Sequence, residues 1–402
     1  MTSRIWLIVL VFLIASTSAS LVAPIETRFI SSLLHDRNLG LIGVPFAIGM
    51  IFYPVFSMIL CCYLNIAQKI IGWACLACAA AVVLSIFSAD IYMYSLAKIP
   101  WALAAVLCGP VLLVHLQHYF HGAQNKEHFF GYLNAAQALL GSAFAYVGGA
   151  LGERSLRVPF FVLAAVFVVT GIVVFLFRDK KFFCETANTL QPNIAFAVLG
   201  RNVPAGFMLF YITGFSLVFV NLALRPLIWP QLFQSLPKSN LLVGSIFSVM
   251  GIVAFISSFG FGRIAGYFGL KPVILGSMSL ILVCNIGILR FAQIPALLYV
   301  FAVGIAACEA MLMPARISII SMHIPKKLLG AFGGLDTLLT SVFSVSSVLI
   351  FGQLQARTGV GQAYGFFIGL SCLALITTCW MGYSRIRFTA KKSLPAAESE
   401  PA

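Results

Sequence analysis

The chain has 402 residues, of which 61% are hydrophobic and only 9% are charged, and its mean hydropathy is +1.03. A water-soluble domain of this size cannot cover its surface with so few charges, so the composition predicts a polytopic helical membrane protein. The formal net charge of +14 is typical of nucleic-acid-binding proteins, but here the cations lie singly or in pairs between apolar runs. That distribution fits membrane topology and argues against a nucleic-acid partner, because no basic face remains to bind one.

Apolar runs of about 20 residues, long enough to cross a bilayer, recur along the whole chain. The first resembles a secretory signal, with Arg4 before an apolar run and small residues after it, but the apolar stretch continues to Ile25. We therefore interpret it as a membrane span. The pattern predicts twelve spans, at residues 5–27, 41–64, 69–89, 91–117, 130–151, 158–177, 204–229, 241–262, 272–290, 294–319, 328–351 and 361–384.

One polar interruption divides this series into two equal parts. Residues 178–203 contain four charged side chains close together, Arg178 to Lys181, followed by Gln191-Pro192. We predict an all-α fold with a six-helix bundle at 1–177, a cytoplasmic linker at 178–203 and a second six-helix bundle at 204–384. The Pro/Ala/Glu-rich tail at 385–402 is predicted to be disordered.

An even number of spans places both termini on one side of the membrane. With the N-terminus inside, roughly twice as many Lys and Arg residues fall in the inner short segments as in the outer ones, as the positive-inside rule expects. The sequence therefore predicts a multi-pass protein of the cell (inner) membrane with both termini in the cytoplasm. We expect this protein to be a monomer that lipid surrounds.

A glycine-rich loop, GFGRIAGYFGLKP at 260–272, lies between two membrane-length runs and carries Arg263 and Lys271. Its spacing resembles the loop signature of the major facilitator superfamily of secondary transporters, G-x-x-x-D-[RK]-x-G-[RK]-[RK]. Gly262, Gly269 and Lys271 match that signature, whereas Gly266 stands where the family has Asp. The resemblance implies two bundles related by pseudo-twofold symmetry, which work by alternating access around a site at mid-membrane.

Weak internal similarity supports the two-bundle interpretation. The run Gly131-x5-Gln137-x-Leu-Leu aligns with Gly330-x5-Asp336-x-Leu-Leu about half a chain later, and Pro24…Gly43 aligns with Arg225…Gly244. In the family, spans one, four, seven and ten line the central cavity. Charged residues in these four spans are therefore the leading candidates for function.

Glu309 is the strongest candidate, because it lies deep within a span where a charged group costs about 2.5–3.5 kcal/mol to insert. Burial disfavours the charged carboxylate, so Glu309 is predicted to bind and release a coupling proton or to bind a cationic substrate. The alternative is a structural role, in which Glu309 pairs with Arg316 one heptad away or makes a polar contact between helices.

Four further charged residues fall near the same predicted cavity. Lys98 in the fourth span is interpreted as a cavity cation or, alternatively, as a side chain that reaches out to the interface. Glu26, Arg28 and Arg225 lie at the outer ends of spans one and seven. They are interpreted as a salt-bridged anchor between these spans or as an outer gate that closes when the cavity faces inward.

Polar residues at other positions yield weaker hypotheses. Asn134, Gln137 and Asp336 lie near the inner ends of spans five and eleven, where gating against the loop motif and simple packing are equally plausible. The side chains of Asn221, Asn285, Tyr146 and Tyr211 are able to hydrogen-bond a substrate, but no spacing selects them.

A different class of function is suggested by the run His115, His118 and His121, followed by His128. Membrane di-iron oxidases place His clusters near the membrane face, because imidazole suits iron. Such centres need about eight His residues in several boxes, and the chain contains six in all. A membrane metalloenzyme is therefore a minor alternative, and we predict neither a metal nor a cofactor.

These observations predict a secondary transporter rather than an enzyme. The solute is expected to be a small organic compound and the coupling ion a proton bound at Glu309. Efflux of an amphiphilic or anionic compound is weakly favoured, because the spans are mostly apolar and aromatic. The alternatives are proton-driven uptake of a metabolite such as an amino acid or organic acid, and transport of a lipid or siderophore.

Overall fold

The computed structural model describes residues 3–34, 39–62, 68–108, 126–176, 215, 220–221, 223–323 and 329–384. Within these ranges all regular secondary structure is helical, as predicted. The first half contains α1 (Ser3–Thr17), the 3-10 helix η1 (Ser18–Leu21), α2 (Glu26–Leu33), η2 (Leu39–Leu41), α3 (Val44–Cys62), α4 (Gln68–Ile86), α5 (Ile91–Val106), α7 (Lys126–Gly152) and α8 (Val158–Leu176). The second half contains a helix through residues 223–232, α11 (Ser239–Phe268), α12 (Leu270–Arg290), α13 (Pro295–His323), α14 (Leu329–Thr358) and α15 (Val360–Ser384).

Seven of the described helices are long and apolar enough to cross a membrane, or eight if the bent pair Val9–Leu21 and Glu26–Leu33 forms one span. Shorter apolar helices lie at Val44–Phe56, Ile70–Ile86 and Ile91–Val106. Each predicted span other than 204–229 overlaps a described helix, the first of them α1 together with η1. Residues 109–117 of the fourth span and most of the span 204–229 lie outside the described residues. The protein is thus a multi-pass membrane protein. Some of the twelve predicted spans include residues outside the described ranges.

Local sequence explains where several helices begin and end. The 50° bend between η1 and α2 falls at residues 22–25, which include Pro24. α5 begins at Ile91 because the carboxylate of Asp90 accepts a hydrogen bond of 2.8 Å from the backbone N–H of Met93. α11 ends at Gly269, whose φ of +83° suits glycine alone, and α12 begins at the next residue. The glycine of the loop motif thus allows one helix to turn directly into the next.

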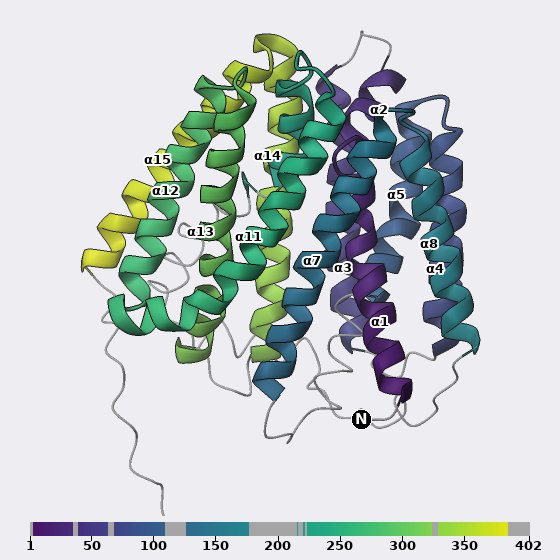
Figure 1. Cartoon of the computed structure of the whole chain (residues 1–402), viewed down its shortest axis with the longest axis horizontal. Coiled ribbons are helices and arrows are strands. Elements are labelled where there is room, and N and C mark those ends of the chain that lie inside the picture. The colour runs from purple at the N-terminus through teal and green to yellow at the C-terminus, as the bar shows by residue number, and fades with distance from the viewer. Residues whose placement is uncertain are drawn as a thin grey trace, which may run out of the picture.

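The two halves stand side by side in Figure 1, with the first half on the right and α11 to α15 on the left. α1 begins at the lower end in this view and α2 lies at the upper end. At the crossing of α7 and α11, a Cβ atom on Gly149 would lie only 2.9 Å from the Cα of Gly244. At the start of α3, a Cβ atom on Gly43 would lie 2.5 Å from the carbonyl oxygen of Val348 in α14. These small residues let the backbones of the two halves touch.

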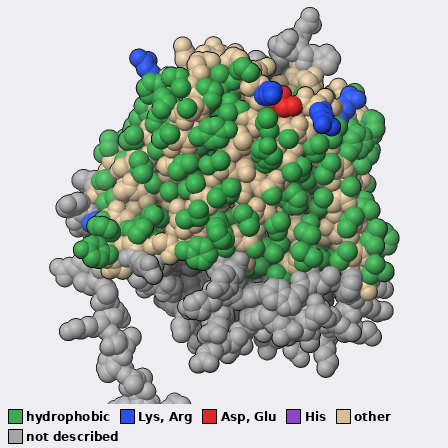
Figure 2. Space-filling model, viewed as in Figure 1, with side chains coloured by type: hydrophobic (Ala, Val, Ile, Leu, Met, Phe, Trp, Pro, Cys, Tyr) green, Lys and Arg blue, Asp and Glu red, His purple; other side chains and the backbone are tan. Residues whose placement is uncertain are grey.

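Hydrophobic side chains cover the face shown in Figure 2 between its two ends. The charged side chains visible on this face lie near the upper end, apart from one at the left edge. Large exposed side chains such as Trp73, Leu176 and Ile376 are 64%, 72% and 63% accessible. Exposed apolar side chains and charges restricted to the rims are what a bilayer requires of the surface that it surrounds.

Candidate functional site

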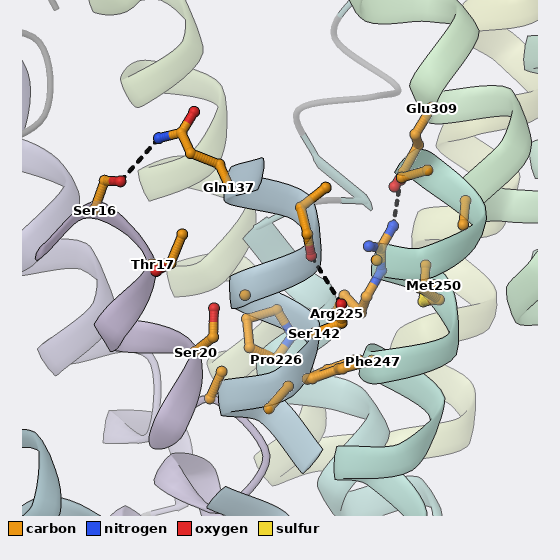
Figure 3. Close-up of a pocket in the computed structure, with 17 residues that line it drawn as sticks. Ser16, Thr17, Ser20, Gln137, Ser142, Arg225, Pro226, Phe247, Met250 and Glu309 are labelled. Atoms are coloured by element: carbon orange, nitrogen blue, oxygen red, sulfur yellow. Dashed lines mark hydrogen bonds and ion pairs between the residues drawn. The ribbon is translucent and has the colours of Figure 1, made fainter. Parts of the chain in front are cut away.

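A pocket of about 550 Å³ lies between the two halves. Its walls come from α1, η1 and α7 on one side and from helix 223–232, α11 and α13 on the other. Figure 3 shows the labelled side chains of both walls around the same space. Its polar lining consists of Ser16, Thr17, Ser20, Gln137, Ser142, Arg225 and Glu309, and its apolar lining includes Pro226, Phe247 and Met250.

Helical spacing explains why these residues share one surface. Residues three or four positions apart lie on the same face of a helix, so a single stripe of each helix reaches the pocket. In α7 this stripe is Gln137, Gly141 and Ala145, and in α11 it is Phe247, Met250, Gly251 and Ala254.

The first-half wall presents hydrogen-bond acceptors to the pocket. The hydroxyls of Ser16 and Thr17 both donate to the carbonyl oxygen of Leu13, at 3.3 and 2.6 Å. Ser142 donates to a carbonyl one turn earlier in α7, at 2.8 Å. Because these hydroxyl hydrogens are already used, the oxygens are left to accept. Ser16 does so, taking a hydrogen bond of 2.8 Å from Nε2 of Gln137 (Figure 3).

The second-half wall carries an ion pair. Nη2 of Arg225, in the helix through 223–232, donates to Oε1 of Glu309 in α13 (Figure 3). The two side chains are 14% and 12% exposed, so the pair is largely buried but borders the pocket. The guanidinium carbon of Arg225 also lies 5.3 Å from the centre of the Trp229 ring. Glu309 therefore pairs with Arg225 and not with Arg316, which donates to the hydroxyl of Thr340 at 3.5 Å.

Glu26 and Lys98 form a second buried ion pair, within the first half. Oε1 of Glu26 also accepts a hydrogen bond of 2.8 Å from the hydroxyl of Tyr94, and Nζ of Lys98 lies 3.6 Å from the centre of the Trp101 ring. Lys98 is only 8% exposed, so its side chain does not reach out to the interface. Neither residue lines the pocket between the halves.

Arg28 joins the two halves at the upper end rather than lining the pocket. Its Nη1 donates to Oδ1 of Asn240 at 2.7 Å, and Nδ2 of Asn240 donates to the carbonyl oxygen of Gly152 at 3.1 Å. Beside it, the hydroxyl of Thr27 donates to the carbonyl oxygen of Pro226 at 2.6 Å. We call Thr27, Arg28 and Asn240 the upper latch. The three residues that the sequence grouped together therefore do not contact one another. Glu26 pairs with Lys98, Arg28 bonds Asn240, and Arg225 pairs with Glu309.

The loop-motif residues lie at the α11–α12 turn. Gly269 forms the turn and Lys271 lies in the first turn of α12. Gly262 and Arg263 belong to α11 and Asp336 to α14, but their side chains lie outside the described part of the chain. The His115, His118 and His121 cluster also lies outside it, as does Tyr211, and no group of metal-binding side chains occurs among the residues that are described.

Several pocket residues were not singled out from the sequence. Ser16, Thr17, Ser20 and Ser142 are small polar residues in apolar spans, and many such residues merely bond their own helix. The usable signal was the four-residue spacing of Ser16 and Ser20 on one face. Gln137, considered for gating, lies in the pocket wall, whereas Tyr146 is 49% exposed and does not line the pocket.

Comparison with known proteins agrees with this arrangement. A sequence profile of the Major Facilitator Superfamily matches residues 207–402. The class B tetracycline resistance protein of Escherichia coli is 25% identical over 270 residues, which span 63% of this chain and 64% of that protein. The second half of the chain is thus similar to the major facilitator superfamily, and most of the chain is similar to this resistance protein. The glycine-rich loop at 260–272 lies within the matched region.

Solved structures share the fold of this chain. The crystal structure of the nucleoside transporter NupG superposes with a TM-score of 0.72 at 13% identity, covering 96% of this chain and 100% of that one. A point variant of NupG gives a TM-score of 0.71 at 14% identity, covering 94% and 100%. These matches extend over both halves of the chain, so the two-bundle fold predicted from the loop motif and the internal repeat is confirmed.

Proposed function

We propose that this protein is a secondary active transporter that moves a small organic solute through the pocket between its halves and couples that movement to protons at Glu309. The observation that supports this most directly is the Arg225–Glu309 ion pair on the pocket wall. A buried carboxylate is stable there because the guanidinium compensates its charge. Transport rather than enzymatic catalysis also agrees with the match of residues 207–402 to the Major Facilitator Superfamily.

The pair offers a simple coupling chemistry. When Glu309 is ionised, it holds Arg225; when it takes a proton, the attraction is lost and the guanidinium is released toward the pocket. Proton binding and ion pairing therefore exclude each other. A solute that carries an acceptor group competes with the ionised Glu309 for Arg225, so proton and solute occupancy become linked.

The pocket walls indicate the kind of solute. The acceptor oxygens on the first-half wall suit hydroxyl or amine donors, Phe247 and Met250 suit an apolar part, and Arg225 suits an anionic or carbonyl oxygen. We therefore propose an amphiphilic organic compound. The similarity to a tetracycline resistance protein favours efflux, whereas a solute held by Arg225 would bind together with the proton on Glu309 and favours uptake; the direction of transport in vesicles distinguishes the two.

We further propose that the protein lies in the cell (inner) membrane and that both of its termini are in the cytoplasm. The upper end in Figure 1 would then face outward. The upper latch and the Gly149–Gly244 contact would close the outer side, which corresponds to the inward-facing state of an alternating-access cycle.

Transport into vesicles under an imposed pH gradient tests this function. A thermal-shift screen of the detergent-solubilised protein, with tetracycline and nucleosides among the panel, first identifies a binding compound. The labelled compound should then accumulate only when the gradient is present. Movement opposite to the proton flow supports efflux, and movement with the proton flow supports uptake instead.

The Glu309→Gln variant should lose gradient-driven accumulation while retaining exchange of labelled for unlabelled solute. The Glu309→Asp variant, which keeps an ionisable group, should retain part of the driven transport. A Glu309→Gln variant that accumulates solute as well as the parent protein would overturn the proposed coupling role.

A further inference from the structure

A second, much smaller cavity lies behind Arg225. Its volume is about 10 Å³, and its lining is Asn221, Leu224, Arg225, Ile228, Trp229, Asn285 and Tyr364. Arg225 is the residue that lines both this cavity and the large pocket. A space of this size, with several polar groups around it, matches what a single buried water molecule requires.

The polar wall of this small cavity is a chain of hydrogen bonds. The hydroxyl of Tyr364 donates to Oδ1 of Asn285. Nδ2 of Asn285 donates to Oδ1 of Asn221 at 2.8 Å and to the carbonyl oxygen of Ile281 at 2.9 Å. Asn285 and Tyr364 are 3% and 4% exposed, so the chain is buried. Since both amide hydrogens of Asn285 are used, the spare capacity of this wall lies in the lone pairs of its oxygens.

The guanidinium of Arg225 requires hydrogen-bond acceptors such as these oxygens. Its guanidinium carries five N–H donors and keeps its charge at any physiological pH. In the ion pair, Glu309 compensates that charge. Once Glu309 carries a proton, the guanidinium remains charged in a largely buried position, and a charge left there without compensation is strongly destabilising. Oxygen dipoles on its other side are the groups placed to stabilise it.

We propose that the small cavity binds one water molecule, which accepts a hydrogen bond from Arg225 and donates to an amide oxygen of Asn221 or Asn285. Tyr364 and Asn285 are then positioning residues that hold the guanidinium while Glu309 is protonated. The water site is inferred from the cavity alone. The role of Tyr364 and Asn285 while Glu309 is protonated rests on the proposed function.

The titratable groups around this site come from four helices. Arg225 and Glu309 form the pair itself, Tyr364 comes from α15, Cys284 from α12 and Cys308 from α13. The first-half wall opposite them contributes serines, Thr17 and Gln137, none of which titrates near neutral pH. Glu309 is therefore the group around the pair to which the proposed function assigns the coupling proton.

The pH profile of transport tests the positioning role. Replacing Tyr364 by Phe removes the hydroxyl oxygen and with it part of the stabilisation of a released Arg225. Protonation of Glu309 then becomes less favourable relative to ion pairing, so the pH at which driven transport is half-maximal should fall. We expect a fall of about one pH unit, a tenfold change in proton affinity. Tyr299→Phe is the matched control, because that hydroxyl bonds Ser245 at 2.5 Å and should leave the midpoint unchanged.

Radiolytic hydroxyl-radical footprinting of the parent protein tests the water site without any variant. A bound water produces radicals beside the residues that surround it, so Tyr364 should be oxidised several-fold faster than Tyr94. Tyr94 is the matched reference, because it is also buried and its hydroxyl donates to Glu26. Equal rates for the two tyrosines would overturn the water site.

The outcomes distinguish this inference from the proposed function. If Glu309→Gln abolishes driven transport but Tyr364→Phe leaves the midpoint where the parent has it, the positioning role is wrong and the coupling role stands. If Glu309→Gln retains driven transport, the coupling role fails, and the footprinting result alone decides the water site. Faster oxidation of Tyr364 together with a lowered midpoint supports both parts.

Discussion

Arg225 in the second half and Glu26 in the first each form a buried ion pair with a residue three predicted spans later, but Arg225 supplies the base of its pair and Glu26 the acid. Glu26 lies in the first predicted span and pairs with Lys98 in the fourth; Arg225 lies in the seventh and pairs with Glu309 in the tenth. The acid therefore lies in the earlier span of the first-half pair and in the later span of the second-half pair. Only the second pair borders the pocket between the halves, which separates a structural pair from a candidate working pair.

The first-half pair should matter for stability rather than for coupling. Glu26→Gln or Lys98→Met leaves one buried charge without its partner, and we expect a loss of about 3–5 kcal/mol in the free energy of unfolding. The double variant Glu26→Gln with Lys98→Met should lose less, because no charge remains unpaired. Thermal unfolding in detergent measures both effects. Arg154→Gln, at an exposed site, is the control and should change stability by less than about 0.5 kcal/mol; single variants as stable as that control would contradict the prediction.

The upper latch should set the balance between conformations. Arg28→Ala removes the hydrogen bond of 2.7 Å to Asn240, and hydrogen bonds from charged groups contribute about 1.5–3 kcal/mol each. The upper ends of the two halves should therefore separate in a larger fraction of molecules. Distances between spin labels at Ser32 and Lys238, both exposed near this end, report the change. Ser31→Ala is the control, since that hydroxyl bonds Thr27 in its own helix; identical distance distributions for Arg28→Ala and the parent would refute the latch.

The α7–α11 crossing should not tolerate a side chain. A Cβ atom on Gly149 would lie 2.6 Å from the carbonyl oxygen of Asn240 and 2.9 Å from the Cα of Gly244, and neither backbone atom can rotate away. Gly149→Ala should destabilise the protein by about 1–3 kcal/mol, as overpacking does. Gly276→Ala is the matched change in α12, where no atom lies within 4 Å of the new Cβ. It should be neutral or stabilising by about 0.5–1 kcal/mol, and equal melting temperatures for the two variants would disprove the close contact.

The first-half wall should contribute to solute binding without affecting coupling. Gln137→Leu removes the amide that donates to Ser16 at 2.8 Å and leaves the Arg225–Glu309 pair in place. We expect the KM for the transported solute to rise about 2- to 12-fold, as the loss of one hydrogen bond of 0.5–1.5 kcal/mol predicts. The pH midpoint of transport should stay where the parent protein has it. A shifted midpoint with unchanged KM would reverse the roles assigned to the two walls.

The sequence by itself determined the fold class and the positions of the apolar helices that the structure describes, and its loop motif indicated the resemblance to the major facilitator superfamily. Apolar length is a local property, because each span must satisfy its own backbone in lipid, and it can be read without knowing any partner. The turn at Gly269 and the choice of Glu309 as a candidate residue follow from equally local facts, a glycine where two helices meet and a carboxyl group deep in an apolar run.

Only the tertiary structure decided which charges meet. Arg316, one heptad from Glu309, was the nearby partner that the sequence offered, yet the guanidinium that reaches Glu309 belongs to a different helix. Lys98 was expected in the shared cavity and instead pairs with Glu26 inside the first half. The sequence analysis also did not single out the serine and threonine wall or the small cavity behind Arg225. The physical reason is that contacts between helices depend on how far each one rotates about its own axis, and that rotation is fixed by the packing of the whole bundle rather than by any one span.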